Sequence, residues 1–220
     1  MLDGEKTRML KRPVSETLFE QLCFNRSVPC EAIPTGPVRT PDFAISLGGV
    51  RIVCEVKQID PNAEDLKELE TVGSGEATGR LVPNRLWKKL KDVSGQLKAA
   101  SLSGCPTLLV VYDNTPFKIY LLHFDVVQAM FGAHSVTVSF SKERDADPIV
   151  SKPFFGGNRG LTDRENTSVS ALAILDGGPL VETALRVYHN PYASVVLRPE
   201  LLEALPVVQC LLPGATTVKI

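Results

Sequence analysis

The fold of this chain of 220 residues is decided by residues 40–57, TPDFAISLGGVRIVCEVK. Two runs of β-branched and apolar residues flank Gly48 and Gly49, and a Gly-Gly pair suits the two-residue primed turn of a β-hairpin. If these glycines form the turn, the register of both strands is fixed, and Ile45 lies opposite Ile52. The segment therefore predicts an antiparallel hairpin.

The predicted hairpin has one apolar face and one charged end, because side chains alternate between the two faces of a strand. Asp42 falls directly opposite Glu55, and Lys57 projects from the same face. Two carboxylates in this position have Cβ atoms about 4.5–5.5 Å apart and repel each other. A divalent cation, which takes oxygen ligands, would make the arrangement tolerable. The opposite face holds residues that suit a core: Phe43, Ile45, Leu47, Val50, Ile52, Cys54 and Val56.

The spacing of Pro41-Asp42 and Glu55-Val56-Lys57 resembles the motif of the PD-(D/E)xK superfamily of restriction-endonuclease-like nucleases. An acidic helix expected over residues 15–22 is similar to the first helix of those proteins. The motif covers about residues 15–58, and the resemblance of the fold extends to about residue 113. It implies an Mg²⁺-dependent (or Mn²⁺-dependent) nuclease that binds nucleic acid, with DNA favoured, cleavage of the endonuclease type and a possible homodimer.

The resemblance also implies roles for individual residues. Asp42, Glu55 and the backbone carbonyl of Val56 would hold one or two metal ions, and Lys57 would orient or help deprotonate the attacking water or stabilise the transition state. Glu16 would approach the metal or orient a ligand. Glu20 shares its helix face four residues later. The phase of this helix stays open, and either acid can equally be a solvated surface residue.

The densest basic segment of the chain lies after the hairpin and includes Arg80, Arg85, Lys88, Lys89, Lys91 and Lys98. Much of it falls in an amphipathic helix expected over residues 84–100. Phosphate backbones are attracted to such patches, so we expect Arg85, Lys88 and Lys91 to bind nucleic acid. A merely solvated basic face is the alternative. The resemblance adds Gln96, which corresponds to a glutamine of related nucleases that faces the substrate phosphates, although no tyrosine follows at the expected spacing.

The remaining pattern predicts an α/β (α+β) protein: a restriction-endonuclease-like core with a mixed β-sheet flanked by helices. A helix is expected to about residue 25 and an edge strand near residues 30–33. The continuous apolar run at residues 107–113 predicts a buried strand parallel to the second hairpin strand. We expect one domain, residues 1–220, whose core spans about 13–122.

The C-terminal part, about residues 123–220, is expected to be a mainly β elaboration of that core. A strand is predicted at residues 117–122, at the end of the core. Within the elaboration, strands are predicted at residues 135–140, 168–175 and 181–188, and helices at residues 125–131 and 199–205. Residues 60–85 and 141–166 break the regular pattern and are expected to be loops, the first with a helical stretch at 64–70. Such long loops are often functional lids, although ordinary surface insertions are as consistent with the sequence.

Composition limits the class of protein further. The chain contains no apolar run of 18 residues and no apolar leader, so neither a transmembrane helix nor a signal peptide is expected. Five cysteines without a Cys-x-x-Cys pair predict reduced thiols in a cytoplasmic protein. The net charge of −1 is consistent with a second hypothesis, a catalytically silent nuclease fold that serves as a binding module or partner subunit. The presence of all three motif side chains argues against it.

Overall fold

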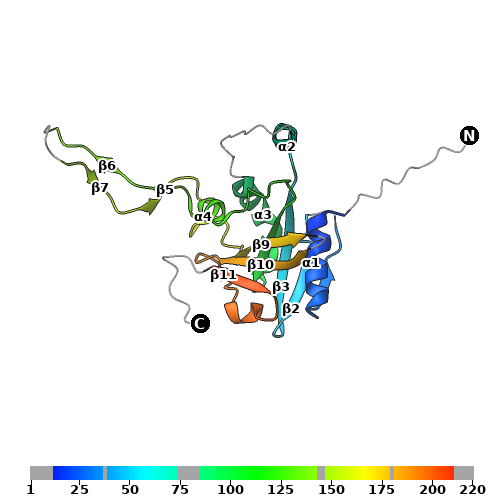
Figure 1. Ribbon diagram of the computed structural model, residues 1–220. Helices are drawn as coiled ribbons and strands as arrows, with labels where there is room; N and C mark the ends of the chain where they lie inside the picture. The colour runs from blue at the N-terminus through cyan, green and yellow to red at the C-terminus, as the bar shows by residue number, and fades with distance from the viewer. Residues whose placement is uncertain (1–11, 37–38, 74–84, 143–146, 179–180, 211–220) are drawn as a thin grey trace, which may run out of the picture.

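The computed structural model describes residues 12–36, 39–73, 85–142, 147–178 and 181–210. A seven-stranded mixed sheet with the strand order β1-β2-β3-β4-β9-β10-β11 forms its centre (Figure 1). In chain order the elements are α1 (Val14–Asn25), β1 (Cys30–Ala32), β2 (Phe43–Leu47), β3 (Val50–Ile59), α2 (Ala63–Gly73), α3 (Arg85–Leu102), β4 (Thr107–Asp113), α4 (His123–Phe131), β5 (His134–Ser135), β6 (Val138–Ser139), β7 (Ile149–Val150), β8 (Phe154–Phe155), β9 (Ala171–Gly178), β10 (Val181–His189), the 3₁₀ turn η1 (Pro199–Leu202) and β11 (Val207–Cys210).

The hairpin of β2 and β3 has the predicted register. Ile45 pairs with Ile52 in an antiparallel ladder. Gly48 and Gly49 have φ angles of 55° and 76°, as a primed turn requires. The predicted mixed sheet is confirmed as well, because β4 runs parallel to β3 and β1 pairs antiparallel with β2 at the edge.

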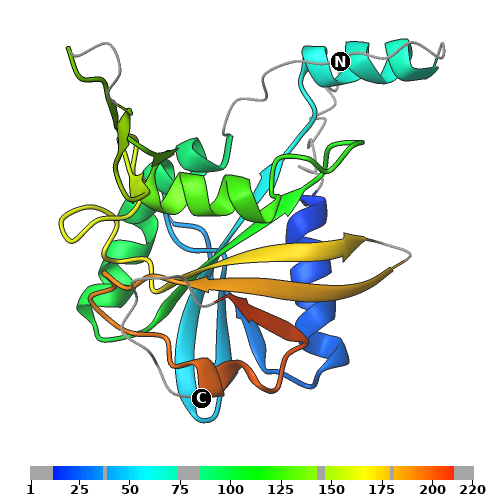
Figure 2. The ribbon, with the colours of Figure 1, turned by 60° about the vertical axis from the view of Figure 1, so that its left-hand side comes forward.

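Helices lie on both faces of the sheet (Figure 2), and each face carries a separate hydrophobic core. On one face, the apolar side of the hairpin packs against α1 and against residues around η1. On the other face, α3 and α4 pack over β3, β4 and β9. The α3 stripe of Leu86, Leu90, Val93 and Leu97 is fully buried, as its spacing predicts. The sheet is therefore the middle layer of three.

The C-terminal part continues the same sheet. The predicted strands at 168–175 and 181–188 form β9 and β10, and β9 lies parallel to β4. The predicted terminal helix is a 3₁₀ turn, and β11, which pairs parallel with β10, was not predicted. Among the described residues, no helix combines the length and apolar character needed to cross a membrane.

The strand predicted at residues 117–122 is absent, and this prediction was wrong. The chain turns back on the end of β4, where Lys118 has a φ of 52°. The carboxylate of Asp113 accepts hydrogen bonds from the N–H groups of Thr115 and Tyr120, at 2.9 and 3.0 Å. Tyr120 and Leu121 are apolar because they enter the core next to α4, and not because they alternate along a strand.

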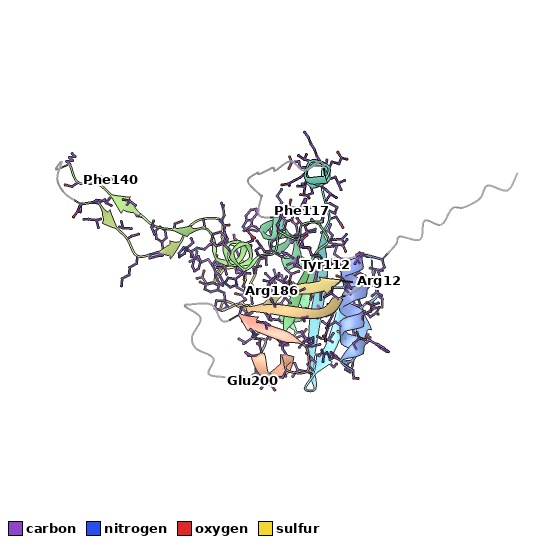
Figure 3. All side chains as sticks on the ribbon, in the orientation of Figure 1. Arg12, Tyr112, Phe117, Phe140, Arg186 and Glu200 are labelled. Atoms are coloured by element: carbon purple, nitrogen blue, oxygen red, sulfur yellow. The ribbon has the colours of Figure 1, made fainter. Side chains whose placement is uncertain are left out.

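The single strand predicted at residues 135–140 is also incorrect. Two short strands, β5 and β6, pair with β8 and β7 in two separate two-stranded ladders. Between them, the N–H of Thr137 donates instead to the Ser151 hydroxyl, at 2.8 Å. These residues form an arm that extends from the body, with the exposed Phe140 toward its outer end (Figure 3).

A substitution at Gly160 tests how closely α4 packs on the segment that leads to β9. A Cβ at this position would collide with the carbonyl oxygen of Ala129 and lie 3.0 Å from a methyl group of Leu90. We expect Gly160→Ala to lower the free energy of unfolding by about 1–3 kcal/mol. Urea denaturation gives the measurement. The control is Gly157→Ala, because a Cβ on Gly157 meets no atom within 4 Å. Equal midpoints for both variants would contradict the packing described.

Candidate functional site

Asp42 lies immediately before β2 and is tied to β3 by two hydrogen bonds. Its N–H donates to the carbonyl of Cys54 at 3.1 Å, and its Oδ2 accepts the N–H of Val56 at 2.7 Å. The paired register ends at Phe43 opposite Cys54, and the N–H of Asp42 bonds that same Cys54 carbonyl, so Asp42 lies at the end of the ladder next to the Glu55-Val56 step of β3. The hairpin therefore brings the two acids together at one end of the strands, although the paired register stops one residue short of the predicted pair of Asp42 and Glu55.

Glu55 is a fully buried carboxylate with only half of its hydrogen-bonding capacity used. Its Oε1 pairs with the ammonium of Lys57, while its Oε2 is buried and has no hydrogen-bond partner among the described residues. Burial raises the pKa of Glu55 to about 7, and the negative charge of Asp42 adds to that effect. The hydrogen bond and the charge of Lys57 act in the opposite direction, as does the neighbouring amide of Gln96. The protein thus holds a carboxylate where its charged form is disfavoured.

Asp42 experiences the same electrostatic conflict. Burial raises its pKa, and the Val56 N–H and the Lys57 charge only partly oppose that change. The side chain of Lys57 is 27% exposed. Two desolvated acids therefore share one ammonium group, and a further positive charge would relieve both.

An open cleft of about 570 Å³ contains this group of side chains. Loop residues before β2 form one wall, and α3 forms the other. The lining residues are Thr35, Gly36, Arg39, Thr40, Asp42, Glu55, Lys57, Lys89, Asp92 and Gln96. Four of the side chains expected from the sequence to act together, Asp42, Glu55, Lys57 and Gln96, therefore meet in one cavity.

The α3 wall presents a stripe that sequence reasoning identified only in part. Gln96 donates from Nε2 to the carbonyl of Thr40 at 3.3 Å. Lys89, which was not selected, is half-buried in the cleft, and burial followed by the charges of Lys57 and Arg85 lowers its pKa. Counting back four and seven residues from Gln96 along the helix gives Asp92 and Lys89. This helical spacing could have identified Asp92 and Lys89 from the sequence as neighbours of Gln96 in the cleft.

The three basic residues expected to contact phosphate do not line the cleft. Arg85 bonds Oδ2 of Asp65 at 3.1 Å, and its guanidinium lies 4.7 Å from the centre of the Tyr120 ring. Lys91 pairs with Glu165 on the other side of α3. Lys88 is exposed to solvent outside the cleft. Arg80 lies outside the described residues.

The two acids of α1 differ in their position relative to the cleft. Both pair with Arg12, through Glu16 at 3.1 Å and Glu20 at 2.6 Å. Glu16 is less exposed, at 22% against 46% for Glu20. After burial and the effects of Val56 and Lys57, the charge of Glu16 further raises the pKa of Asp42. Glu16 is thus the acid of α1 that acts electrostatically on Asp42, although it does not line the cleft.

The site offers oxygen ligands for a hard cation. The described residues contain no cluster of three metal-ligating side chains, so protein ligands would be two carboxylates and a carbonyl. The N–H of Val56 points to Asp42, and its carbonyl, on the same edge of the strand, faces the same side. Mg²⁺ commonly binds one or two carboxylates and keeps several waters. The unpaired buried oxygen of Glu55 fits such an ion.

Comparisons of this chain with protein-family models, curated proteins and solved structures found no match. The functional assignment therefore depends on the cleft itself. Its distinctive features are a buried acid with an unpaired oxygen, a second acid held in the same cavity by hydrogen bonds to the backbone of β3, and two lysines.

The raised pKa of Glu55 predicts a pH dependence of stability. Between its ordinary value of 4.5 and about 7, the folded state binds more protons at Glu55 than the unfolded state. The free energy of unfolding should therefore fall as pH rises through this window, by on the order of 3 kcal/mol without divalent metal. Denaturation of the wild type and of Glu55→Gln at each pH isolates this contribution. A difference between the two proteins that does not change from pH 4.5 to 7.5 would contradict it.

Proposed function

We propose that the protein is a metal-dependent phosphodiester hydrolase, an endonuclease that acts on DNA and has a restriction-endonuclease-like core. The observation that carries the proposal is the buried, unpaired oxygen of Glu55 beside Asp42 and Lys57. A buried carboxylate without a partner is costly, and a bound cation is the simplest group that would compensate it.

The fold supports the same reading. The helix α1 precedes an edge strand and the hairpin, and α3 then leads to β4, parallel to β3. This is the arrangement implied by the resemblance to PD-(D/E)xK nucleases. The N–H of Ser15 bonds the side chain of Gln58 at 2.9 Å, which fixes the start of α1 next to the end of the Glu-x-Lys segment.

Each cleft residue has a chemical role in this proposal. Asp42, Glu55 and the Val56 carbonyl would hold Mg²⁺ or Mn²⁺, which supplies charge stabilisation to the phosphate and lowers the pKa of water. Glu55 bonds the ammonium of Lys57, which in this proposal would hold the attacking water or donate to a phosphate oxygen. The amide of Gln96 and the ammonium of Lys89 line the opposite wall, where they can bind phosphate oxygens.

A catalytically silent binding module is the second candidate function. It is favoured by one observation, that Lys57 already pairs with Glu55 and partly neutralises the acids without any metal. The two functions differ in what divalent metal does to the protein.

Metal binding should appear as added stability. At ten times its dissociation constant, Mg²⁺ or Mn²⁺ is expected to raise the free energy of unfolding by about 1.4 kcal/mol. Glu55→Gln and Asp42→Asn should lose this gain. Glu203→Gln, which removes an exposed carboxylate far along the chain, should keep it. Thermal unfolding with and without metal gives the result, and an equal gain for all four proteins would place the metal elsewhere.

Cleavage of plasmid DNA and of single strands tests the chemistry. Lys57→Ala and Asp42→Asn should lower the Mg²⁺-dependent rate at least about 100-fold, because each removes a group that stabilises the transition state. Lys152→Ala, an exposed lysine on the arm, is the matched control. Full activity in both cleft variants would make the assignment wrong. A wild type that neither cleaves nor gains stability with metal would be the silent module.

A further inference from the structure

A second cavity, of about 530 Å³, lies against α3 outside the acid cleft. The helix contributes Lys91, Gly95 and Lys98, and the segment that leads to β9 contributes residues 164–168. None of these residues lines the acid cleft. We call this second cavity the basic groove.

The basic groove carries an excess of positive charge. Lys91, Lys98 and Arg164 face a single acid, Glu165, so three cations and one carboxylate leave a net charge of +2. Glu165 pairs with Lys91. Lys98 and Arg164 have no ion pair within the part of the chain that the structure describes, and both are exposed. Two unpaired cations around one cavity attract an anion.

The wall opposite α3 is held in place before any ligand binds. The hydroxyl of Thr162 accepts the N–H groups of Arg164 and Glu165, at 3.2 and 2.9 Å. Asn166, in the left-handed region with a φ of 57°, donates to the Gly160 carbonyl at 2.6 Å. The groove therefore does not have to pay the full entropic cost of ordering a loop on binding.

Gly95 exposes helix backbone to the basic groove. Gly95 lies inside α3, where glycine costs about 0.5–1 kcal/mol relative to alanine. A Cβ there would meet no atom within 4 Å, so packing within the described fold does not require glycine. Without a side chain at Gly95, a ligand can approach the helix closely between Lys91 and Lys98.

The cleft and the groove lie on two sides of the same helix. At about 100° per residue, the stripe of Lys89, Asp92 and Gln96 and the stripe of Lys91, Gly95 and Lys98 flank the core-facing stripe of α3 on opposite sides. A helix with its side chains is about 10–12 Å across, and the major groove of B-DNA is about 12 Å wide. The two cavities are thus placed to receive two phosphate backbones with α3 between them.

We propose that the basic groove binds the phosphodiester backbone of double-stranded DNA, opposite the strand whose phosphate enters the acid cleft. The placement of the other DNA strand in the acid cleft rests on the proposed function. The contact in the groove rests only on its own charge and shape. The substrate is then a duplex, which α3 enters through the major groove.

Binding of a short fluorescent DNA duplex, followed by anisotropy in EDTA, tests the groove without metal or cleavage. Lys98→Glu and Gly95→Glu should each raise the dissociation constant at least tenfold. Gly95→Ala, which adds only a methyl group, and Lys152→Glu, the same charge change on the arm, should stay within about twofold. Lys98→Ala should reduce the slope of log affinity against log salt by about one.

The outcomes separate this inference from the proposed nuclease activity. Wild-type affinity in Lys98→Glu and Gly95→Glu would overturn the groove even if the protein cleaves DNA. Equal affinity for single strands, equally weakened by both variants, would overturn the duplex arrangement. Loss of duplex binding in both groove variants would support the groove, even in a protein that cleaves nothing with metal, and in that case only the proposed function would fail.

Discussion

The hydrogen bond from the Val56 N–H to the carboxylate of Asp42 connects the fold to the candidate site. It exists because Gly48 and Gly49 close the hairpin in one register. A slip of one residue would move every side chain of a strand to the opposite face of the sheet. The same register that buries the apolar side of the hairpin therefore also forces the two acids together, and the fold cannot keep one without the other.

The acid pair lowers the stability of the folded protein, and interactions elsewhere in the molecule have to compensate for that loss. A buried ion pair such as Glu55 with Lys57 is weak evidence of stabilisation, because desolvation of both charges opposes their attraction. The favourable free energy comes from the two apolar cores on either face of the sheet. Enzymes commonly sacrifice stability at the active site in this way. The placement of Glu55 on β3, an interior strand of the seven-stranded sheet, is consistent with such a trade.

Features that depend on local interactions could be predicted from the sequence, whereas features that depend on tertiary contacts could not. The register of β2 and β3 and the buried stripe of α3 depend on neighbouring residues and on helix period, and both were correct. Which polar stripe of α3 faces the cleft depends on the tertiary position of the helix, so charge density favoured Lys88 and Lys91 whereas the cleft contains Lys89. The turn at residues 117–122 depends on Asp113, whose carboxylate captures backbone N–H groups that a strand would use elsewhere.

The position of β4 has a consequence for how the protein can be divided. All seven of its residues are buried, and it pairs with β3 on one side and β9 on the other. A fragment that ended before β9 would leave an open, apolar strand edge, which is a template for pairing with other chains. The first half of the chain is therefore not a minimal module that could be excised, transplanted or inherited alone. The strands that follow β4 are needed to keep the sheet that carries the site intact.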